Sequence, residues 1–193
     1  MELRSILSLP WLFTILLTAL TLTALQWFQE DLLFERSLIN EGEWWRIITG
    51  NFVHNNSPHL YMNLLGLALL GLLFNAYFPI RCFIISTIIL SLLVGLGLYF
   101  YAPRLEMYVG FSGALYGLYL LGAVTALKHK DMITGIGIFI IIIGKLVWDI
   151  FDPSLNQNSA DLIEISIATE SHWLGAIGGL IIGLFYFFTM KND

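Results

Sequence analysis

Residues 110–128 read Gly-Phe-Ser-Gly-Ala-Leu-Tyr-Gly-Leu-Tyr-Leu-Leu-Gly-Ala-Val-Thr-Ala-Leu-Lys, an apolar run that begins with a serine between two glycines. From residue 111 the run is close to the length that a helix needs to cross the hydrocarbon core of a bilayer, about 20 residues. Polar groups at membrane depth are costly and usually functional. The stretch therefore predicts a transmembrane helix that carries a functional serine, Ser112.

The composition of the whole chain indicates a membrane protein. Of the 193 residues, 58% are hydrophobic and 12% are charged, whereas an ordinary globular domain has about 25% charged residues. This pattern predicts an all-α integral membrane protein with a single domain over residues 1–193. Six helical spans are expected, at about 7–28, 58–78, 80–101, 111–128, 132–151 and 171–190.

Charge, cysteine and histidine content argue against several classes of site. The net charge of −5 and the lack of a basic patch give no reason to expect nucleic acid as a partner. Cys82 is the single cysteine, so an intramolecular disulfide is excluded. His54 and His59 are five residues apart, which is poor spacing for two metal ligands on one helix face. We therefore expect no metal and no cofactor.

The basic residues predict the orientation of the spans. One side of the predicted bundle holds Arg4, Arg81, Lys128, Lys130 and Lys191. By the positive-inside rule this side is cytoplasmic, and an even number of spans places both termini there. The second, fourth and sixth spans then all run inward, so their first turns lie in one layer near the outer face. The polar residues of that layer are His59, Asn63, Ser112 and His172.

Ser112 and His172 in this layer predict a nucleophile and its general base. A serine hydroxyl becomes an effective nucleophile when a neighbouring neutral imidazole takes its proton. His59 and Asn63 are four residues apart and share a helix face, so both can donate to a developing oxyanion. The backbone N–H of Ser112, at the start of a helix, is a third candidate donor.

Small residues predict close contact between the fourth and sixth spans. A spacing of four residues recurs within two sets of glycines, Gly113 and Gly117, then Gly175, Gly179 and Gly183. Such spacing lets transmembrane backbones approach closely, although it is common in any helical bundle. Tyr116 lies one turn after Ser112, where its ring can support the imidazole of His172.

Lys145 and Asp149 are charged residues four apart in the fifth span, so they can pair on one helix face. One interpretation is a neutralised ion pair near the interface, with Lys145 extending outward to water. The other is that the pair faces the bundle and shapes a substrate cleft, since intramembrane charges are usually functional. Both interpretations remain open at the level of sequence.

The ordered motifs resemble the rhomboid family of intramembrane serine proteases across nearly the whole chain. They are Trp45-Arg46, the series His54, His59 and Asn63, Gly110-Phe111-Ser112-Gly113, and His172-x-x-Gly175-x-x-x-Gly179. The resemblance implies a six-helix rhomboid bundle whose Ser–His dyad has no third acidic member. It also implies that His59 and Asn63 line the oxyanion hole and that His54 and Arg46 brace the first outer loop. The fifth span would be the mobile side through which a substrate helix enters.

Within that family the chain is similar to the rhombosortases. The similarity lies in its minimal length and in three runs, Trp44–Gly50, Tyr108-Val109-Gly110 and Gly144-Lys145-Leu146. It implies a multi-pass protein of a bacterial inner membrane, with its site near the periplasmic side. The implied substrates are secreted proteins with a C-terminal Gly-Gly-type tail.

Other functions remain as alternatives. Tyr116 favours a general rhomboid protease that cleaves other single-span membrane proteins, because the subgroup often has histidine there. A non-catalytic binding protein on the same fold typically lacks the serine or the histidine, and this chain has both. A small transporter would predict inverted repeats or broken helices, and the sequence has no such pattern.

Overall fold

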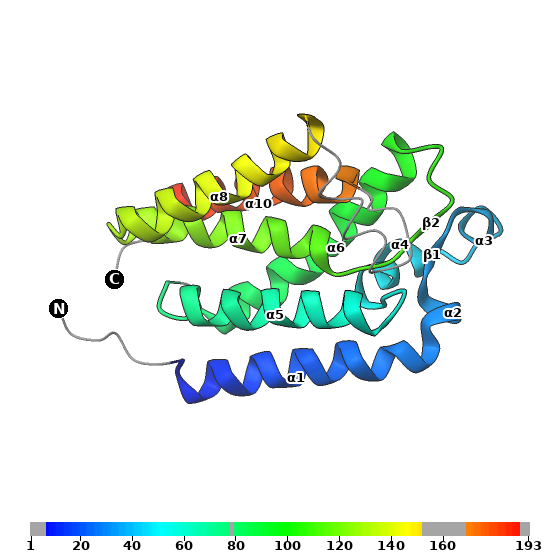
Figure 1. Cartoon of the computed structure of the whole chain (residues 1–193), viewed down its shortest axis with the longest axis horizontal. Helices are drawn as coiled ribbons and strands as arrows, with labels where there is room; N and C mark the ends of the chain where they lie inside the picture. The colour runs from blue at the N-terminus through cyan, green and yellow to red at the C-terminus, as the bar shows by residue number, and fades with distance from the viewer. Residues whose placement is uncertain (1–6, 78, 152–168, 190–193) are drawn as a thin grey trace.

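A computed structural model describes residues 7–77, 79–151 and 169–189 of the chain. Six long helices of these residues form a bundle (Figure 1): α1 (Leu9–Leu25), α5 (Ser57–Phe74), α6 (Ile80–Tyr101), α7 (Ser112–Lys128), α8 (Met132–Phe151) and α10 (Thr169–Thr189). Five helical segments among the described residues are long and apolar enough to cross a membrane, the first of them extending from Leu9 to Leu32. The expectation of an all-α membrane protein is therefore confirmed. The remaining long helix, α7, has 17 residues.

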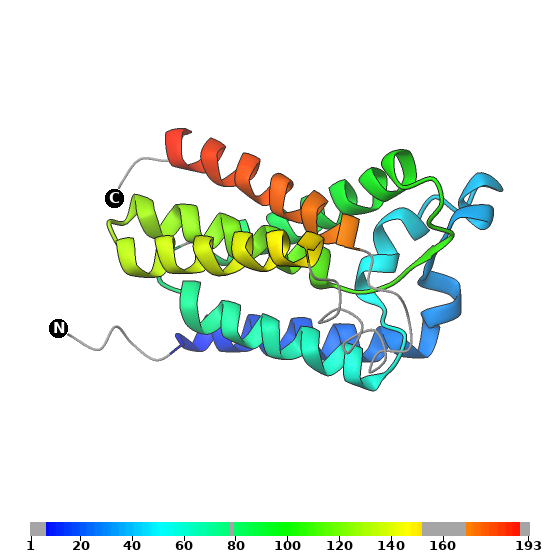
Figure 2. The same cartoon turned by 45° about the horizontal axis from the view of Figure 1, so that its top comes forward.

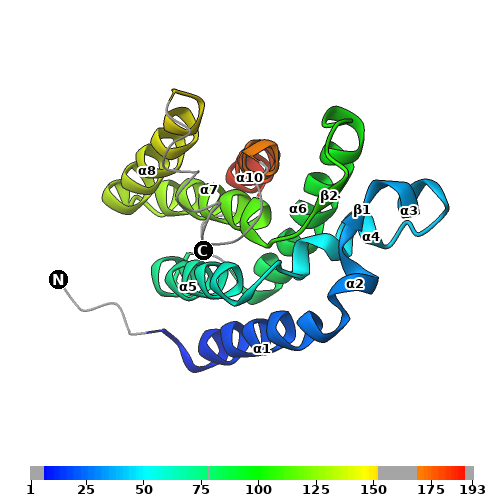
Figure 3. The ribbon, with the colours of Figure 1, turned by 45° about the vertical axis from the view of Figure 1, so that its right-hand side comes forward.

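The 17-residue helix α7 lies at the centre of the bundle. It contacts α5, α6, α8 and α10, and Figure 3 shows it between α5 on one side and α8 with α10 on the other. Most of its side chains are buried, and many of them are glycine or alanine. Small side chains let neighbouring helices approach α7 closely. In contrast, α1 and α8 expose most of their apolar residues, as helices facing lipid do.

The backbones of α7 and α10 touch along their glycines. A Cβ atom added to Gly175 would overlap the carbonyl oxygen of Gly113, and one added to Gly179 would overlap the carbonyl oxygen of Gly117. Any side chain at these two positions would push the helices apart. The first turns of α7 and α10 are therefore held side by side.

Short elements gather at one end of the bundle, which we call the loop end. Between α1 and α5 the chain forms η1 (Gln26–Phe28), α2 (Gln29–Leu32), β1 (Phe34–Glu35), α3 (Arg36–Asn40), α4 (Arg46–Thr49) and η2 (Gly50–Phe52). Strand β1 pairs antiparallel with β2 (Met107–Tyr108), so that Phe34 lies opposite Tyr108. This two-residue ladder ties the segment after α1 to the segment that leads into α7.

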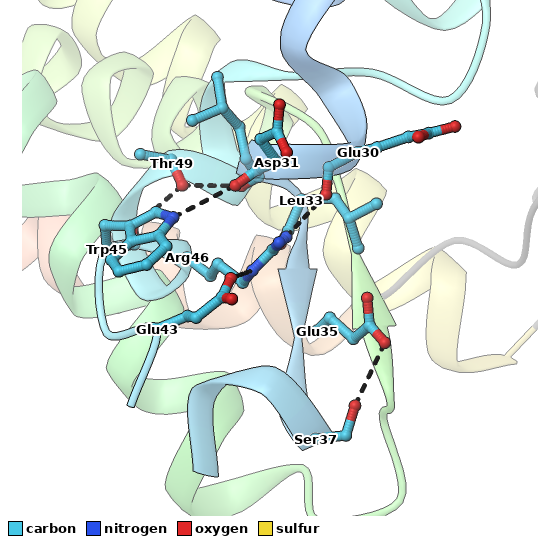
Figure 4. Close-up of polar contacts among 10 residues, drawn as sticks. Glu30, Asp31, Leu33, Glu35, Ser37, Glu43, Trp45, Arg46 and Thr49 are labelled. Carbon is cyan, nitrogen blue, oxygen red and sulfur yellow. Dashed lines mark hydrogen bonds and ion pairs between the residues drawn. The ribbon is translucent and has the colours of Figure 1, made fainter. Parts of the chain in front are cut away.

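Arg46 stabilises this first loop from within (Figure 4). Its Nη1 donates to the carbonyl oxygens of Glu30 and Leu33, both at 2.9 Å, and its Nε lies 2.5 Å from a carboxylate oxygen of Glu43. The Arg46 side chain is almost fully buried, so these bonds also satisfy its donors. Further side-chain bonds to the same segment come from Trp45 and Thr49.

Arg36 binds the C-terminal end of α6, which nothing in the sequence pattern indicates. Its guanidinium donates to four backbone carbonyl oxygens at 2.8–3.0 Å, those of Leu98, Tyr99, Ala102 and Leu105. The last carbonyls of a helix lack partners within the helix and carry partial negative charge. Arg36 therefore satisfies the end of α6 and fixes the first loop to it.

At the opposite end of the bundle, the remaining ends of the long helices lie close together. Figures 1 and 2 show the start of α1, the turn from α7 to α8 and the end of α10 together there. Lys128 Nζ donates to the carbonyl oxygen of Phe187 at 2.7 Å, and the hydroxyl of Tyr77 is bonded to Asp131. The first turns of α5, α7 and α10 consequently all lie at the loop end.

Candidate active site

Ser112 and His172 are in direct contact at the loop end. The Oγ of Ser112 lies 2.9 Å from Nε2 of His172, although the two residues are 60 positions apart in the sequence. Ser112 is the first residue of α7 and is half-buried, while His172 lies in the first turn of α10 and is buried. The glycine contacts between these helices bring the two side chains within hydrogen-bonding distance.

The imidazole of His172 is oriented by ring stacking. Tyr116, one turn after Ser112, stacks on it with ring centroids 4.4 Å apart and an interplanar angle of 18°. Nδ1 of His172 is buried and has no hydrogen-bond partner in the part of the chain that the structure describes. An imidazole held in this way has Nε2 directed at the Ser112 hydroxyl, the geometry that proton abstraction requires.

The turn before Ser112 requires glycine at position 110. Gly110 has a φ of +124°, and a Cβ atom there would lie 2.7 Å from the imidazole of His59. Its N–H donates to the carbonyl oxygen of Gly50 at 3.1 Å, and its own carbonyl accepts from the Tyr108 hydroxyl at 2.7 Å. Burial raises the pKa of Tyr108 to about 12, so this hydroxyl stays protonated and remains a donor.

His54 links the end of α1 to the same turn. Its Nε2 accepts from the backbone N–H of Phe111 at 3.5 Å, and its backbone N–H donates to the side-chain oxygen of Gln26 at 2.8 Å. Burial, together with charge repulsion from His59, lowers the pKa of His54 to about 3. His54 is therefore neutral near pH 7 and can accept. No sequence pattern indicates a role for Gln26, which is only a polar residue at the end of an apolar run.

His59 and Asn63 lie buried on the first two turns of α5, where the Asn56 side chain caps the helix by accepting from the N–H of His59 at 3.0 Å. The His59 ring meets that of His54 edge to face, with centroids 5.0 Å apart. One amide N–H of Asn63 donates to the carbonyl oxygen of His59 at 3.1 Å. Within the described residues neither side chain is hydrogen-bonded to Ser112, so they lie at the same end of the bundle without direct contact with the hydroxyl.

Lys145 and Asp149 form an ion pair on α8 near this site. The Asp149 side chain is 1% exposed, whereas that of Lys145 is 41% exposed. Leu146, which lies between them on α8, is buried in a cluster against which Tyr116 packs. The Asp149 carboxylate therefore faces the bundle, while the Lys145 side chain extends away from the bundle. The first feature fits a pair that shapes a cleft, and the second fits a lysine that reaches toward water.

Comparison with known proteins identifies a family and a relative. The family model described as the Rhomboid domain matches residues 41–190, a range that contains Ser112, His172 and the other side chains of this site except Gln26. Rhomboid protease GluP of Bacillus subtilis (strain 168) is 31% identical over 156 residues, which cover 78% of this chain and 27% of that protein. The chain thus spans about a quarter of the length of that relative.

Proposed function

The chain belongs to the rhomboid family, and from this premise we propose that it is an intramembrane serine protease with Ser112 as nucleophile and His172 as general base. The observation that carries the proposal is the 2.9 Å contact between Ser112 Oγ and His172 Nε2 at the start of two helices. A hydroxyl and a neutral imidazole in this arrangement are the elements of nucleophilic catalysis.

The geometry supports acyl transfer in two steps. Ser112 Oγ attacks the scissile carbonyl carbon while Nε2 of His172 takes the hydroxyl proton. The imidazolium then returns that proton to the leaving amine as the peptide C–N bond breaks, which leaves an acyl-enzyme ester on Ser112. Water, deprotonated by the same imidazole, hydrolyses the ester. Tyr116 keeps the ring in position through both steps by stacking on it.

We assign the oxyanion site to the backbone N–H of Ser112 and the side chains of His59 and Asn63. The Ser112 N–H precedes the helical hydrogen-bond ladder and is available to a ligand. Asn63 keeps a second amide proton beyond the one it donates to His59. Catalytic hydrogen bonds often shorten only when the substrate binds, so the absence of direct contact in the free protein is compatible with this role.

The proposed topology has six spans, with the loop end on the periplasmic side of a bacterial inner membrane and both termini in the cytoplasm. Among the described residues Arg81, Lys128 and Lys130 lie at the end opposite the loops, and Arg36, Arg46 and Arg104 lie at the loop end. The proposed orientation therefore rests on the sequence, which adds Arg4 and Lys191 to the first set. The length of α7 is compatible with a sixth span, because this helix is surrounded by its neighbours and has little contact with lipid.

For the substrate we propose the membrane-anchoring C-terminal tail of secreted proteins, the rhombosortase-like activity, on the basis of the sequence resemblance. Cleavage of other single-span membrane proteins is the alternative. Mass spectrometry of tailed proteins incubated with active enzyme or with Ser112→Ala tests the choice. A new C-terminus that appears at the tail motif only with the active enzyme supports the tail activity, and tails that remain intact contradict it.

Covalent labelling tests the protease assignment itself. A fluorophosphonate should label the detergent-solubilised protein, and both Ser112→Ala and His172→Ala should abolish the labelling. Ser86→Ala is the matched control, because Ser86 is also a buried serine in a long helix but lies outside the site. Labelling that survives both site substitutions would contradict the assignment and leave a non-catalytic rhomboid-fold binding protein as the better description.

A further inference from the structure

We propose that Asp149, paired with Lys145, forms a specificity site that accepts a hydrogen bond from a neutral donor on the substrate segment. The donor would be a side-chain amide or hydroxyl close to the scissile bond. The inference rests on the proteolytic function proposed above and adds the chemistry by which substrates are selected.

One oxygen of the Asp149 carboxylate lacks a hydrogen-bond donor among the described residues. Its Oδ1 is bonded to Lys145 Nζ. Its Oδ2 is buried and has no hydrogen-bond partner in the described parts of the chain. Buried polar atoms in native proteins are nearly always satisfied, and an exception requires a specific explanation. A ligand that arrives only during the reaction provides one.

Packing places Asp149 on the side of α8 that lies against the helices of the dyad. The ring of Tyr116, which stacks on His172, packs against a cluster that includes Leu146 of α8. One turn before Asp149, Leu146 is buried in a cluster that α8 shares with α7 and α10. The face of α8 that carries Asp149 is therefore directed toward the helices that hold the dyad.

Charge balance favours a neutral donor. Lys145 already compensates the charge of Asp149, so a second cation beside the pair would leave an unbalanced positive charge at membrane depth, which is costly. An anion offers no proton to Oδ2. An amide or hydroxyl satisfies the oxygen without adding charge, whereas an apolar side chain leaves it unsatisfied. Sites built around a hydrogen bond reject analogues that lack the bonding group.

Matched substrate pairs test this selection. A single-span test substrate is varied at each position around the scissile bond, with Gln compared against Met and Thr against Val. The members of each pair are similar in size, but only Gln and Thr carry a donor. At one position the donor member should be cleaved with a kcat/KM roughly 10- to 100-fold higher, as expected for a hydrogen bond to a charged group.

The double variant Lys145→Met/Asp149→Leu should bring this ratio close to unity. It removes both charges together, so no unpaired charge is left in the membrane. The ratio is measured within each variant, so a general change in activity divides out. If the double variant does not purify as a monodisperse protein, Asp149→Asn serves instead, because its single acceptor oxygen faces Lys145 and the ratio should again fall.

Several outcomes would overturn the inference. A preference that persists in the double variant assigns the selection to other residues, and a wild-type protein without preference at any position has no such site. Both results leave fluorophosphonate labelling of Ser112 intact, so they refute the specificity site alone. A protein that is not labelled and cleaves none of the substrates refutes the protease function, and the specificity site with it.

Discussion

The catalysis proposed for Ser112 depends on how single side chains hold the imidazole of His172. Tyr116 stacks on the ring, and Nδ1 has no partner among the described residues. In a Ser–His–Asp triad a carboxylate would fix the tautomer and orientation. Here the stacked ring and the close packing of two helices have to provide the orientation, so the alignment of the dyad is sensitive to small changes in packing.

The oxyanion role proposed for Asn63 leads to a first prediction. Asn63→Ala should lower kcat by about 10²- to 10³-fold, the usual effect of removing one oxyanion donor. The measurement is turnover of a single-span test substrate in detergent. Asn75→Ala is the matched control, because Asn75 is a half-buried asparagine that caps the far end of the same helix, away from the site. A wild-type rate for Asn63→Ala would remove this residue from the site.

The lowered pKa of His54 leads us to predict that the stability of the folded protein depends on pH. Its pKa is about 3 in the folded protein and about 6.5 in an unfolded chain. As the pH falls below about 6.5, His54 binds a proton in the unfolded chain. In the folded protein His54 stays neutral until the pH approaches its lower, folded-state pKa. The free energy of unfolding should therefore decrease over this interval.

Replacement of His54 by glutamine isolates its contribution. His54→Gln does not titrate, so the decrease in unfolding free energy between pH 7 and pH 5 should be smaller than in the wild type. Unfolding in mixed micelles at the two pH values provides the measurement. Equal slopes in the two proteins would show that His54 is not the titrating group.

At the scale of elements, the glycine spacing in the sequence anticipates which helices approach closely, but it does not show how closely. Gly175→Ala should separate α7 from α10, because the added methyl group would overlap the carbonyl oxygen of Gly113. We expect loss of fluorophosphonate labelling and a destabilisation of about 1–3 kcal/mol, typical of overpacking.

Gly137→Ala is the control for this substitution. Gly137 lies on α8, and nothing lies within 4 Å of a Cβ atom placed there. Alanine should be neutral or raise the unfolding free energy by up to about 1 kcal/mol, since it is a better helix former than glycine. Full labelling of Gly175→Ala would contradict the proposed dependence of the dyad on backbone contact.

Some contacts that connect these elements involve residues that the sequence does not single out. Arg36 contacts carbonyls 62–69 positions away, and Gln26 contacts His54 from 28 positions away. Neither residue belongs to a periodic pattern or to a motif, and their partners in these contacts are backbone groups, which leave no signature in the sequence. In contrast, Ser112 and His172 could be selected because polar residues are conspicuous in apolar spans.

At the scale of the whole molecule, the orientation in the membrane can be tested by cysteine accessibility. In a Cys82→Ser background, Glu106→Cys lies at the loop end and His129→Cys at the opposite end, both at exposed positions. A membrane-impermeant maleimide that reaches the periplasm should label Glu106→Cys in intact cells, because the loop end is proposed to be periplasmic. It should label His129→Cys only after the inner membrane is opened. The reverse pattern would place the active site on the cytoplasmic side.

The sequence by itself determined the all-α membrane class, because hydrophobic length and low charge act locally along the chain. It also predicted the rhomboid family, which the match over residues 41–190 confirms, and it singled out the candidate dyad. Only the tertiary structure decided the distance from Ser112 to His172, the stacking of Tyr116, the anchoring by Arg36 and Gln26, and the unsatisfied oxygen of Asp149. These features arise from contacts between residues far apart in the chain, and a periodic pattern specifies which face of a helix is buried but not what it touches.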